Sequence, residues 1–162
     1  MSIAESILPE FDHEMANTRK VLACIPDDKL EWKAQDDFHS IGWVGTHLAS
    51  IAGWVEGTLT QDSWDVNPEG GEPYQEPTAA SRQQILDMFD ANLAAGRKAI
   101  AATADEAFMK SWSLVAAGKP MFTMPRIAVI RTFVLNHTIH HRAHLSVYLR
   151  LNGIKVPEMY GA

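Results

Sequence analysis

Apolar residues recur at steps of three and four in four long segments of the chain. These segments are residues 2–25, 40–60, 78–104 and 125–152. Because residues three and four apart lie on one face of an α-helix, the pattern predicts four amphipathic helices. Ser40 and either Thr78 or Ser81 are suitable N-caps, and Gly153 follows the last segment as a stop signal. Pro9 predicts either a kink in the first helix or a helix start near that residue.

Two stretches between these segments break the helical pattern. Residues 61–77 are rich in Gly, Pro and acidic residues, and form either a cover over a pocket mouth or an ordinary solvated crossover. Residues 105–123 place short apolar runs on either side of the sequence AAGKP, which predicts a small hairpin. Short loops favour antiparallel neighbours, whereas a long crossover allows parallel ones. We therefore expect an all-α fold class, with residues 1–162 as a single domain. This domain would be a four-helix bundle with a long crossover between helices two and three.

Composition narrows the class of protein. With 162 residues, 46% hydrophobic and 21% charged, the chain has the make-up of an ordinary globular domain. A net charge of −6 argues against nucleic-acid binding, and no apolar run approaches the length of a membrane span. The single cysteine, Cys24, excludes an intrachain disulfide and is typical of a reducing compartment. We therefore expect a cytoplasmic protein with no membrane partner.

The last helical segment concentrates histidines. Four of the seven histidines of the chain lie there, as two pairs spaced four residues apart: His137 with His141, and His140 with His144. Two imidazoles at this spacing on a helix can bind one metal ion. On a helical wheel, His137 and His141 interrupt the apolar stripe at its centre. A buried polar group without a partner costs about 1–3 kcal/mol, so these two rings need either a metal ion or a hydrogen-bonded core network.

His47 occupies a similar position in the second helical segment. Trp43, Ile51 and Trp54 surround it at helical spacing, so it also lies in the inward stripe. A single histidine in such a stripe is more often a satisfied core residue. Together with a second inward pair on another helix, His47 becomes the natural third ligand. His39, in the connector before this helix, is a weaker candidate.

The order of these motifs resembles a known family. The segment HHRAHLSVYLRLNGIKVPEMYG, residues 140–161, closely resembles the last-helix signature HxxHHRxQLxxYLRxxG of the DinB-like (YfiT-like) family. The segment GWVGTHLASI, residues 42–51, resembles its second-helix histidine motif, and Trp32 also fits the family pattern. The resemblance covers most of the chain. It implies a four-helix bundle that holds a metal ion through three histidines, here His47, His137 and His141.

One position departs from that signature. His144 stands where the family usually has Gln. It lies seven residues from His137, about 10.5 Å along a helix, whereas metal–nitrogen bonds are only about 2.0–2.1 Å long. We therefore expect His140 and His144 to flank the metal site rather than bind its ion. Arg142 points away from the metal on the wheel, which predicts a structural salt bridge.

The resemblance also suggests a reaction. Neutral imidazole suits Zn, Ni, Cu and Fe(II), and we expect Zn or Ni, with Fe as a further alternative. Three protein ligands leave a position open, which is typical of catalytic sites. Some members of the family resemble metal-dependent transferases that hold a low-molecular-weight thiol as a thiolate, and others are regarded as hydrolases. The alternative is a non-enzymatic, metal-binding stress-response protein whose metal is structural.

Oligomeric state follows from the same resemblance. Homodimers recur in the family, so a homodimer is expected here. The wheel places the apolar residues Leu135 and Ile139 on the outer side of the last helix. They would form either a dimer interface or contacts with a neighbouring helix or the tail.

Overall fold

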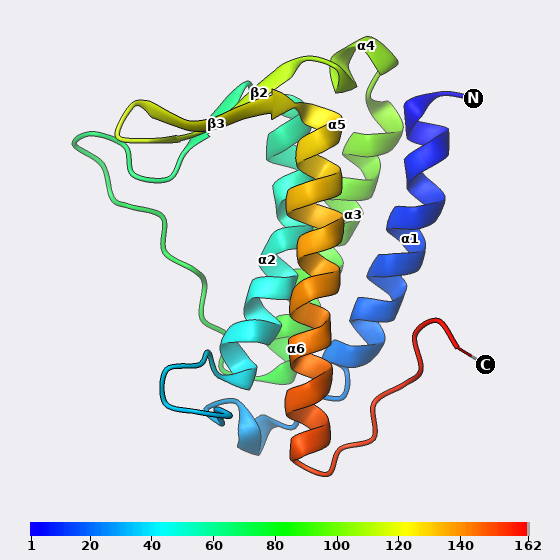
Figure 1. Cartoon of the computed structure of the whole chain (residues 1–162), viewed down its shortest axis with the longest axis vertical. Coiled ribbons are helices and arrows are strands. Elements are labelled where there is room, and N and C mark those ends of the chain that lie inside the picture. Colours follow the sequence, from blue (N-terminus) through cyan, green and yellow to red (C-terminus); the bar gives the residue numbers. More distant parts are fainter. Residues whose placement is uncertain (162) are drawn as a thin grey trace.

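Long helices dominate the computed structural model, which describes residues 1–161, and a small sheet lies at one end (Figure 1). The helices are α1 (Ile3–Leu22), α2 (Ile41–Thr60), α3 (Arg82–Ala102), α4 (Asp105–Phe108), α5 (Arg126–Val129) and α6 (His137–Leu151). A 3-10 turn spans Asp27–Lys29, and a π-helical segment, Ile130–Asn136, joins α5 to α6. The strands are β1 (Ser63–Asp65), β2 (Ser111–Ala116) and β3 (Lys119–Pro125). The four predicted helical segments are confirmed, with their ends shifted by a few residues.

Serine side chains define where three of the long helices begin. The Ser40 hydroxyl accepts a hydrogen bond from the Trp43 backbone N–H at 3.2 Å, as predicted. Of the two candidates for α3, Ser81 is the cap, and it accepts from Gln84 N–H at 3.2 Å. Ser2 caps α1 in a capping box with Glu5. The helix therefore begins at Ile3 and contains Pro9, so the predicted start near residue 9 is wrong.

The long crossover between α2 and α3 sets the direction of the helices. In Figure 1, α2 and α3 run parallel to each other, and α1 and α6 run in the opposite direction. Residues 66–81 carry the chain back along the length of the helices, which a short loop could not do. Gly96 permits close packing of the parallel pair, because a Cβ there would lie 3.0 Å from the Ala52 carbonyl oxygen.

Helix α2 lies at the centre of the core and packs against α3, α6 and the π-helical segment. Ile51, Ala52 and Val55 are fully buried on it, and the hydrophobic core extends from there to all the long helices. His47 is only 7% exposed because it sits on this central helix. Within residues 1–161, no helix is both long and apolar enough to cross a membrane.

The last helix is buried on two sides, which corrects one expectation. It packs against α2 on one side and α1 on the other, so its buried sector is wider than a single stripe. Leu135, expected on the outside, is 1% exposed, and Ile139 is half-buried. Leu135 therefore packs within the hydrophobic core and does not supply a free dimer surface.

Arg142 occupies the side of α6 that faces α1. Its guanidinium donates to Glu14 Oε2 at 2.6 Å and to the Glu14 carbonyl at 2.9 Å, and both side chains are buried. The Tyr160 hydroxyl donates to the same Glu14 carboxylate at 2.7 Å, which ties the C-terminal tail to this pair. The predicted salt bridge of Arg142 is confirmed.

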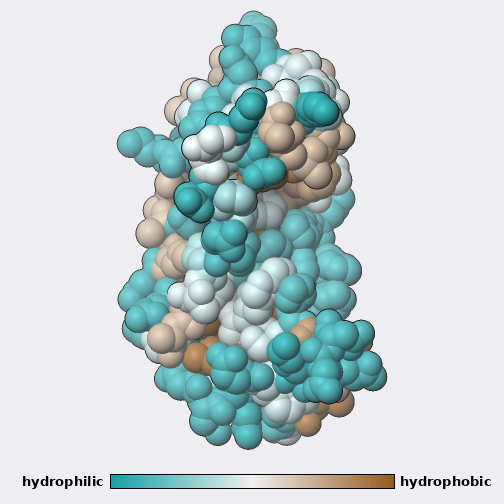
Figure 2. Space-filling model, turned by 90° about the vertical axis from the view of Figure 1, so that its left-hand side faces the viewer, coloured by the Kyte–Doolittle hydropathy of each residue, from teal (hydrophilic) through white to brown (hydrophobic). Residues whose placement is uncertain are grey.

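The chain also contains a three-stranded sheet, so its fold is mostly helical and not purely all-α as expected. β2 and β3 form the predicted hairpin, and Gly118 with φ of 71° lies in its turn. The sequence did not predict β1, which pairs parallel with β2 from within the crossover region. Asp65 accepts from the Gly118 N–H at 2.9 Å and fastens β1 to the hairpin turn. Hydrophilic residues cover most of the face that carries the crossover, with hydrophobic patches between them (Figure 2).

Candidate metal centre

Three histidines that are distant in sequence converge between α2 and the last helix. His47 comes from α2, and His137 and His141 come from the first two turns of α6. Nε2 of His137 lies 3.4 Å from Nε2 of His47 and 2.9 Å from Nε2 of His141. Together they form a group of potential metal ligands, which we call the triad. The three residues selected from the sequence are thus brought to one point.

The spacing of the three nitrogens fits a shared metal ion. Two nitrogens bonded to one metal at about 2.1 Å lie about 3.4 Å apart at a tetrahedral angle and about 3.0 Å apart at a right angle. The observed separations of 3.4 and 2.9 Å match these two values. The donor set, three imidazoles, suits Zn, Ni and Fe(II).

A hydrogen-bonded network explains the same geometry less well. An imidazole nitrogen carries either one hydrogen or one lone pair, so it forms one good hydrogen bond. Nε2 of His137 is approached by two other Nε2 atoms, from His47 and His141. A metal ion would use all three lone pairs at once. The triad is therefore a group of imidazoles that could bind a metal ion, with His137 as its middle member.

The π-helical segment ends where the triad begins. It covers Ile130–Asn136, and His137 is the next residue. A π turn contains more residues than an α turn and often occurs at functional sites. Its wider turn changes the phase of the residues before His137 relative to a regular helix, so a regular wheel misplaces them. This feature has no recognisable pattern in the sequence.

Aromatic side chains enclose the triad. The Trp43 ring stacks on His47 with centroids 4.6 Å apart, and Trp54 lies 5.6 Å from the rings of both His47 and His137. These indoles come from the same helix as His47, at helical spacing on either side of it. They restrict the orientation of the imidazoles and limit the access of water. His39 stacks on the other side of Trp43 at 3.5 Å and does not join the triad.

Glu76 reaches the triad from the crossover, and the sequence analysis missed it. Its Oε2 lies 3.2 Å from Nδ1 of His47, and the Tyr74 hydroxyl donates to the same oxygen at 3.1 Å. Burial raises the pKa of the Glu76 carboxyl, but the His47 imidazole and other polar neighbours outweigh burial and lower it overall. A carboxylate at Nδ1 favours the tautomer of His47 that leaves the Nε2 lone pair free. Only the acidic composition of residues 61–77 hinted at such a contact.

Electrostatics keep the helical pair of the triad neutral. Burial, followed by the neighbouring imidazoles of His47 and His137, lowers the pKa of His141 to about 3. The pKa of His137 is lowered too, first by burial and then by His47. Because only neutral imidazole binds metal, protons compete weakly for these two nitrogens near neutral pH.

A second histidine group lies beside the triad. His140 and His144 face each other with ring centroids 4.3 Å apart, and together with His141 they also offer ligand atoms within 4.8 Å of one another. Both His140 and His144 are exposed. They flank the triad, as expected, and we call them the surface pair. His13 lies elsewhere and contacts Asn17 at 3.1 Å.

Comparisons with known proteins agree with this architecture. A DinB-like protein from Bacillus cereus ATCC 10987 has a similar solved structure, with a TM-score of 0.76 and 24% identity. The superposition covers 96% of this chain and 97% of that one. A DinB-like protein from Bacillus subtilis (YjoA) gives a TM-score of 0.71 at 14% identity, covering 95% and 96%. No curated protein matches the chain significantly. Since the DinB family model matches residues 1–162, the chain belongs to the DinB family.

Proposed function

We propose that this protein binds one divalent metal ion through Nε2 of His47, His137 and His141 and acts as a metal-dependent enzyme. The observation that carries this proposal is the convergence of the three Nε2 atoms from two helices. Zn or Ni is the expected ion, with Fe(II) as the next choice, because imidazole suits all three. Three protein ligands leave room for a substrate atom, which is the arrangement of a catalytic metal site.

Transfer of a low-molecular-weight thiol is the favoured reaction. A bound metal ion supplies Lewis acidity, which lowers the pKa of a thiol or water that it binds. The ordinary pKa of a thiol is about 8.5, whereas that of water is about 15.7. A metal ion therefore holds a thiol as a thiolate more readily than it holds water as hydroxide. The carboxylate that reaches the triad, Glu76, contacts His47 and Tyr74 through its Oε2 and orients the imidazole. These features favour thiol transfer over hydrolysis.

Metal content is the first test. Untagged wild-type protein is incubated with Zn or Ni, dialysed and analysed by mass spectrometry, beside His141→Ala. We expect about one metal ion per wild-type chain and loss of that ion in the variant. His13→Ala is the matched control, since His13 lies outside the triad, and it should keep the metal. Wild-type protein that retains neither metal would rule out the proposed centre.

A second experiment separates an enzyme from a non-enzymatic stress-response protein with a structural metal. Co²⁺-loaded protein is titrated with a small thiol, and the near-ultraviolet sulfur-to-metal absorption band is recorded. A thiol-transfer site predicts that this band appears and that the metal-free protein keeps its helical circular dichroism. No band, together with unfolding when a chelator is added, would instead support a closed structural site.

A further inference from the structure

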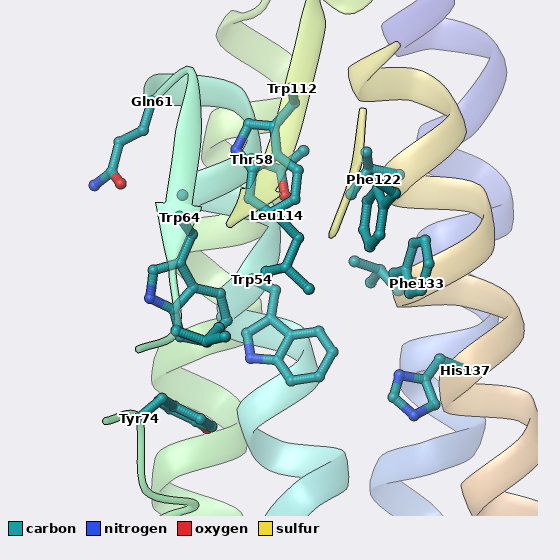
Figure 3. Close-up of a pocket in the computed structure, with 15 residues that line it drawn as sticks. Trp54, Thr58, Gln61, Trp64, Tyr74, Trp112, Leu114, Phe122, Phe133 and His137 are labelled. Atoms are coloured by element: carbon teal, nitrogen blue, oxygen red, sulfur yellow. The ribbon is translucent and has the colours of Figure 1, made fainter. Parts of the chain in front are cut away.

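A cavity of about 440 Å³ adjoins the triad, between α2, the small sheet and the π-helical segment. His137 belongs both to the triad and to the wall of this cavity. In Figure 3, Trp64 and Tyr74 lie on one side, Phe122, Phe133 and His137 lie on the other, and Trp54 lies between them. The volume falls within the range of about 300–1,000 Å³ that is usual for small-molecule sites. The cavity thus connects the metal centre to a space of ligand size.

The wall of the cavity is aromatic and apolar. Phe122 and Phe133 stack in parallel with centroids 4.5 Å apart, and Trp64 meets Tyr74 edge-on at 4.8 Å. Trp54 lies 6.3 Å from Trp64 and completes one side. Rings arranged in this way offer flat faces and edges to a planar ligand. Thr58 and Gln61 lie at the end away from His137 and can hydrogen-bond an uncharged substituent (Figure 3).

The side chains that line the cavity are neutral. Its polar members include Thr58, Gln61, Tyr74 and His137, and no Asp, Glu, Lys or Arg is among the residues that line it. Burial, followed by the nearby Glu76 carboxylate, raises the pKa of Tyr74 to about 12, so its hydroxyl stays protonated. An anion that entered the end of the cavity away from the triad would lose its water without gaining a cationic side chain as a partner, which is costly.

The nearest buried cation is already occupied. Arg126 donates to the carbonyl oxygens of Leu59 and Gln61 at 3.0 and 2.9 Å, and to the Asp62 carboxylate at 2.8 Å. These contacts hold its guanidinium against the end of α2, and it does not line the cavity. Charge near the cavity is therefore used to fasten the fold and is not presented to a ligand.

From this wall we propose that the cavity binds an uncharged aromatic small molecule beside His137. This inference rests on the proposed function only for the role of that molecule, which would be the electrophilic substrate. One of its carbon atoms would form a bond to the thiolate sulfur, and the leaving group on that carbon would depart as an anion with the electron pair of the broken bond. Binding itself depends on the wall alone. The ligand class is thus neutral and planar, as opposed to a carboxylate, a phosphate or a sulfonate.

Gly57 offers a way to test the cavity without damaging the fold. It lies on α2 in the cavity wall, and a Cβ built there meets no atom within 4 Å. Gly57→Leu therefore fills the cavity and also replaces a poor helix former with a good one. Glu56→Leu adds the same side chain at the neighbouring, exposed position and is the matched control.

The experiment compares two fluorescent probes that share one aromatic skeleton. N-phenyl-1-naphthylamine is neutral, and 8-anilinonaphthalene-1-sulfonate carries an added sulfonate. We expect the neutral probe to bind wild type roughly tenfold or more tightly than the sulfonate. Gly57→Leu should lower the affinity for the neutral probe by roughly tenfold or more, while Glu56→Leu should leave that affinity unchanged. Equal binding of both probes, or no effect of Gly57→Leu, would overturn the proposal.

Metal content measured on the same samples separates this inference from the proposed function. Probe binding that depends on Gly57, in protein without metal, would support the cavity and contradict the metal centre. Retention of metal without probe binding would contradict the cavity alone. Both Leu variants should bind as much metal as wild type, since neither residue belongs to the triad.

Discussion

The last helix carries the same histidine spacing twice, with two different outcomes. His137 and His141 meet His47 from α2 between packed helices, and their Nε2 atoms converge. His140 and His144 face each other at a similar spacing but are exposed. The helical spacing alone therefore does not make a metal centre. What differs is the third histidine, the aromatic enclosure by Trp43 and Trp54, and the carboxylate of Glu76 behind His47.

Helix geometry and helix packing make separate contributions to the two histidine pairs. Spacing of four residues brings two imidazoles together on any helix. Burial then lowers the pKa of His141 to about 3, so protons do not compete for the ring. A second helix, α2, supplies the third imidazole, that of His47. The triad is thus a product of helix packing, and the surface pair is a product of the helix alone.

Removing the third ligand should have the largest effect. His47→Ala reduces the triad to a two-histidine site like the surface pair, and we expect Zn affinity to fall by roughly a hundredfold or more. His144→Ala removes half of the surface pair and should change the Zn affinity of the triad by less than about threefold. Isothermal titration calorimetry measures both variants. Similar losses in the two variants would show that the distinction between triad and surface pair is false.

Neutralising the carboxylate behind His47 should have the next largest effect. Glu76→Gln keeps the size of the side chain but weakens its hold on Nδ1 of His47, and such partners typically contribute 10- to 100-fold in metal affinity. Glu72→Gln changes an exposed residue of the same crossover and is the control. Competition with a chromogenic chelator gives the affinities. If both variants retain wild-type affinity, Glu76 is an incidental neighbour.

Acid should destabilise the metal-free protein through the triad more than through the surface pair. The folded protein lowers the pKa of His141 from 6.5 to about 3, so the unfolded chain binds more protons between these values. The stability contributed by this ring is complete above about pH 6.5 and is lost as pH falls toward about 3. We therefore expect the urea midpoint of unfolding to fall between about pH 7.5 and about pH 5. This fall should be smaller in His141→Gln than in wild type. His144→Gln, whose ring has a smaller share in this effect, should behave more like wild type.

The sequence predicted the features that depend on local periodicity. The helical segments, the hairpin, and the inward positions of His47, His137 and His141 all follow from spacing along the chain. The salt bridge of Arg142 was also anticipated. In each case the residues that form the feature, or the helix face that they share, can be recognised from nearby positions.

The features that were missed depend on packing between distant segments. β1 contains three residues and pairs with a strand about fifty residues later, so no local pattern reveals it. The contact between Glu76 and His47 depends on the path of a crossover without regular structure. Leu135 was misplaced because it lies in the π-helical segment, where a wheel with regular helical spacing does not apply. The π-helical segment before His137 adds a change of phase that residue types do not indicate.

The crossover from β1 to α3 has a consequence for how this protein could evolve. Its Val66 and Tyr74 line the cavity and its Glu76 contacts the triad, yet residues 66–81 form no helix or strand. Substitutions and insertions are tolerated best in such connections, because few backbone hydrogen bonds depend on them. Descendants of this chain could therefore change the shape of the cavity by altering this one segment, while inheriting the three histidines on their helices unchanged.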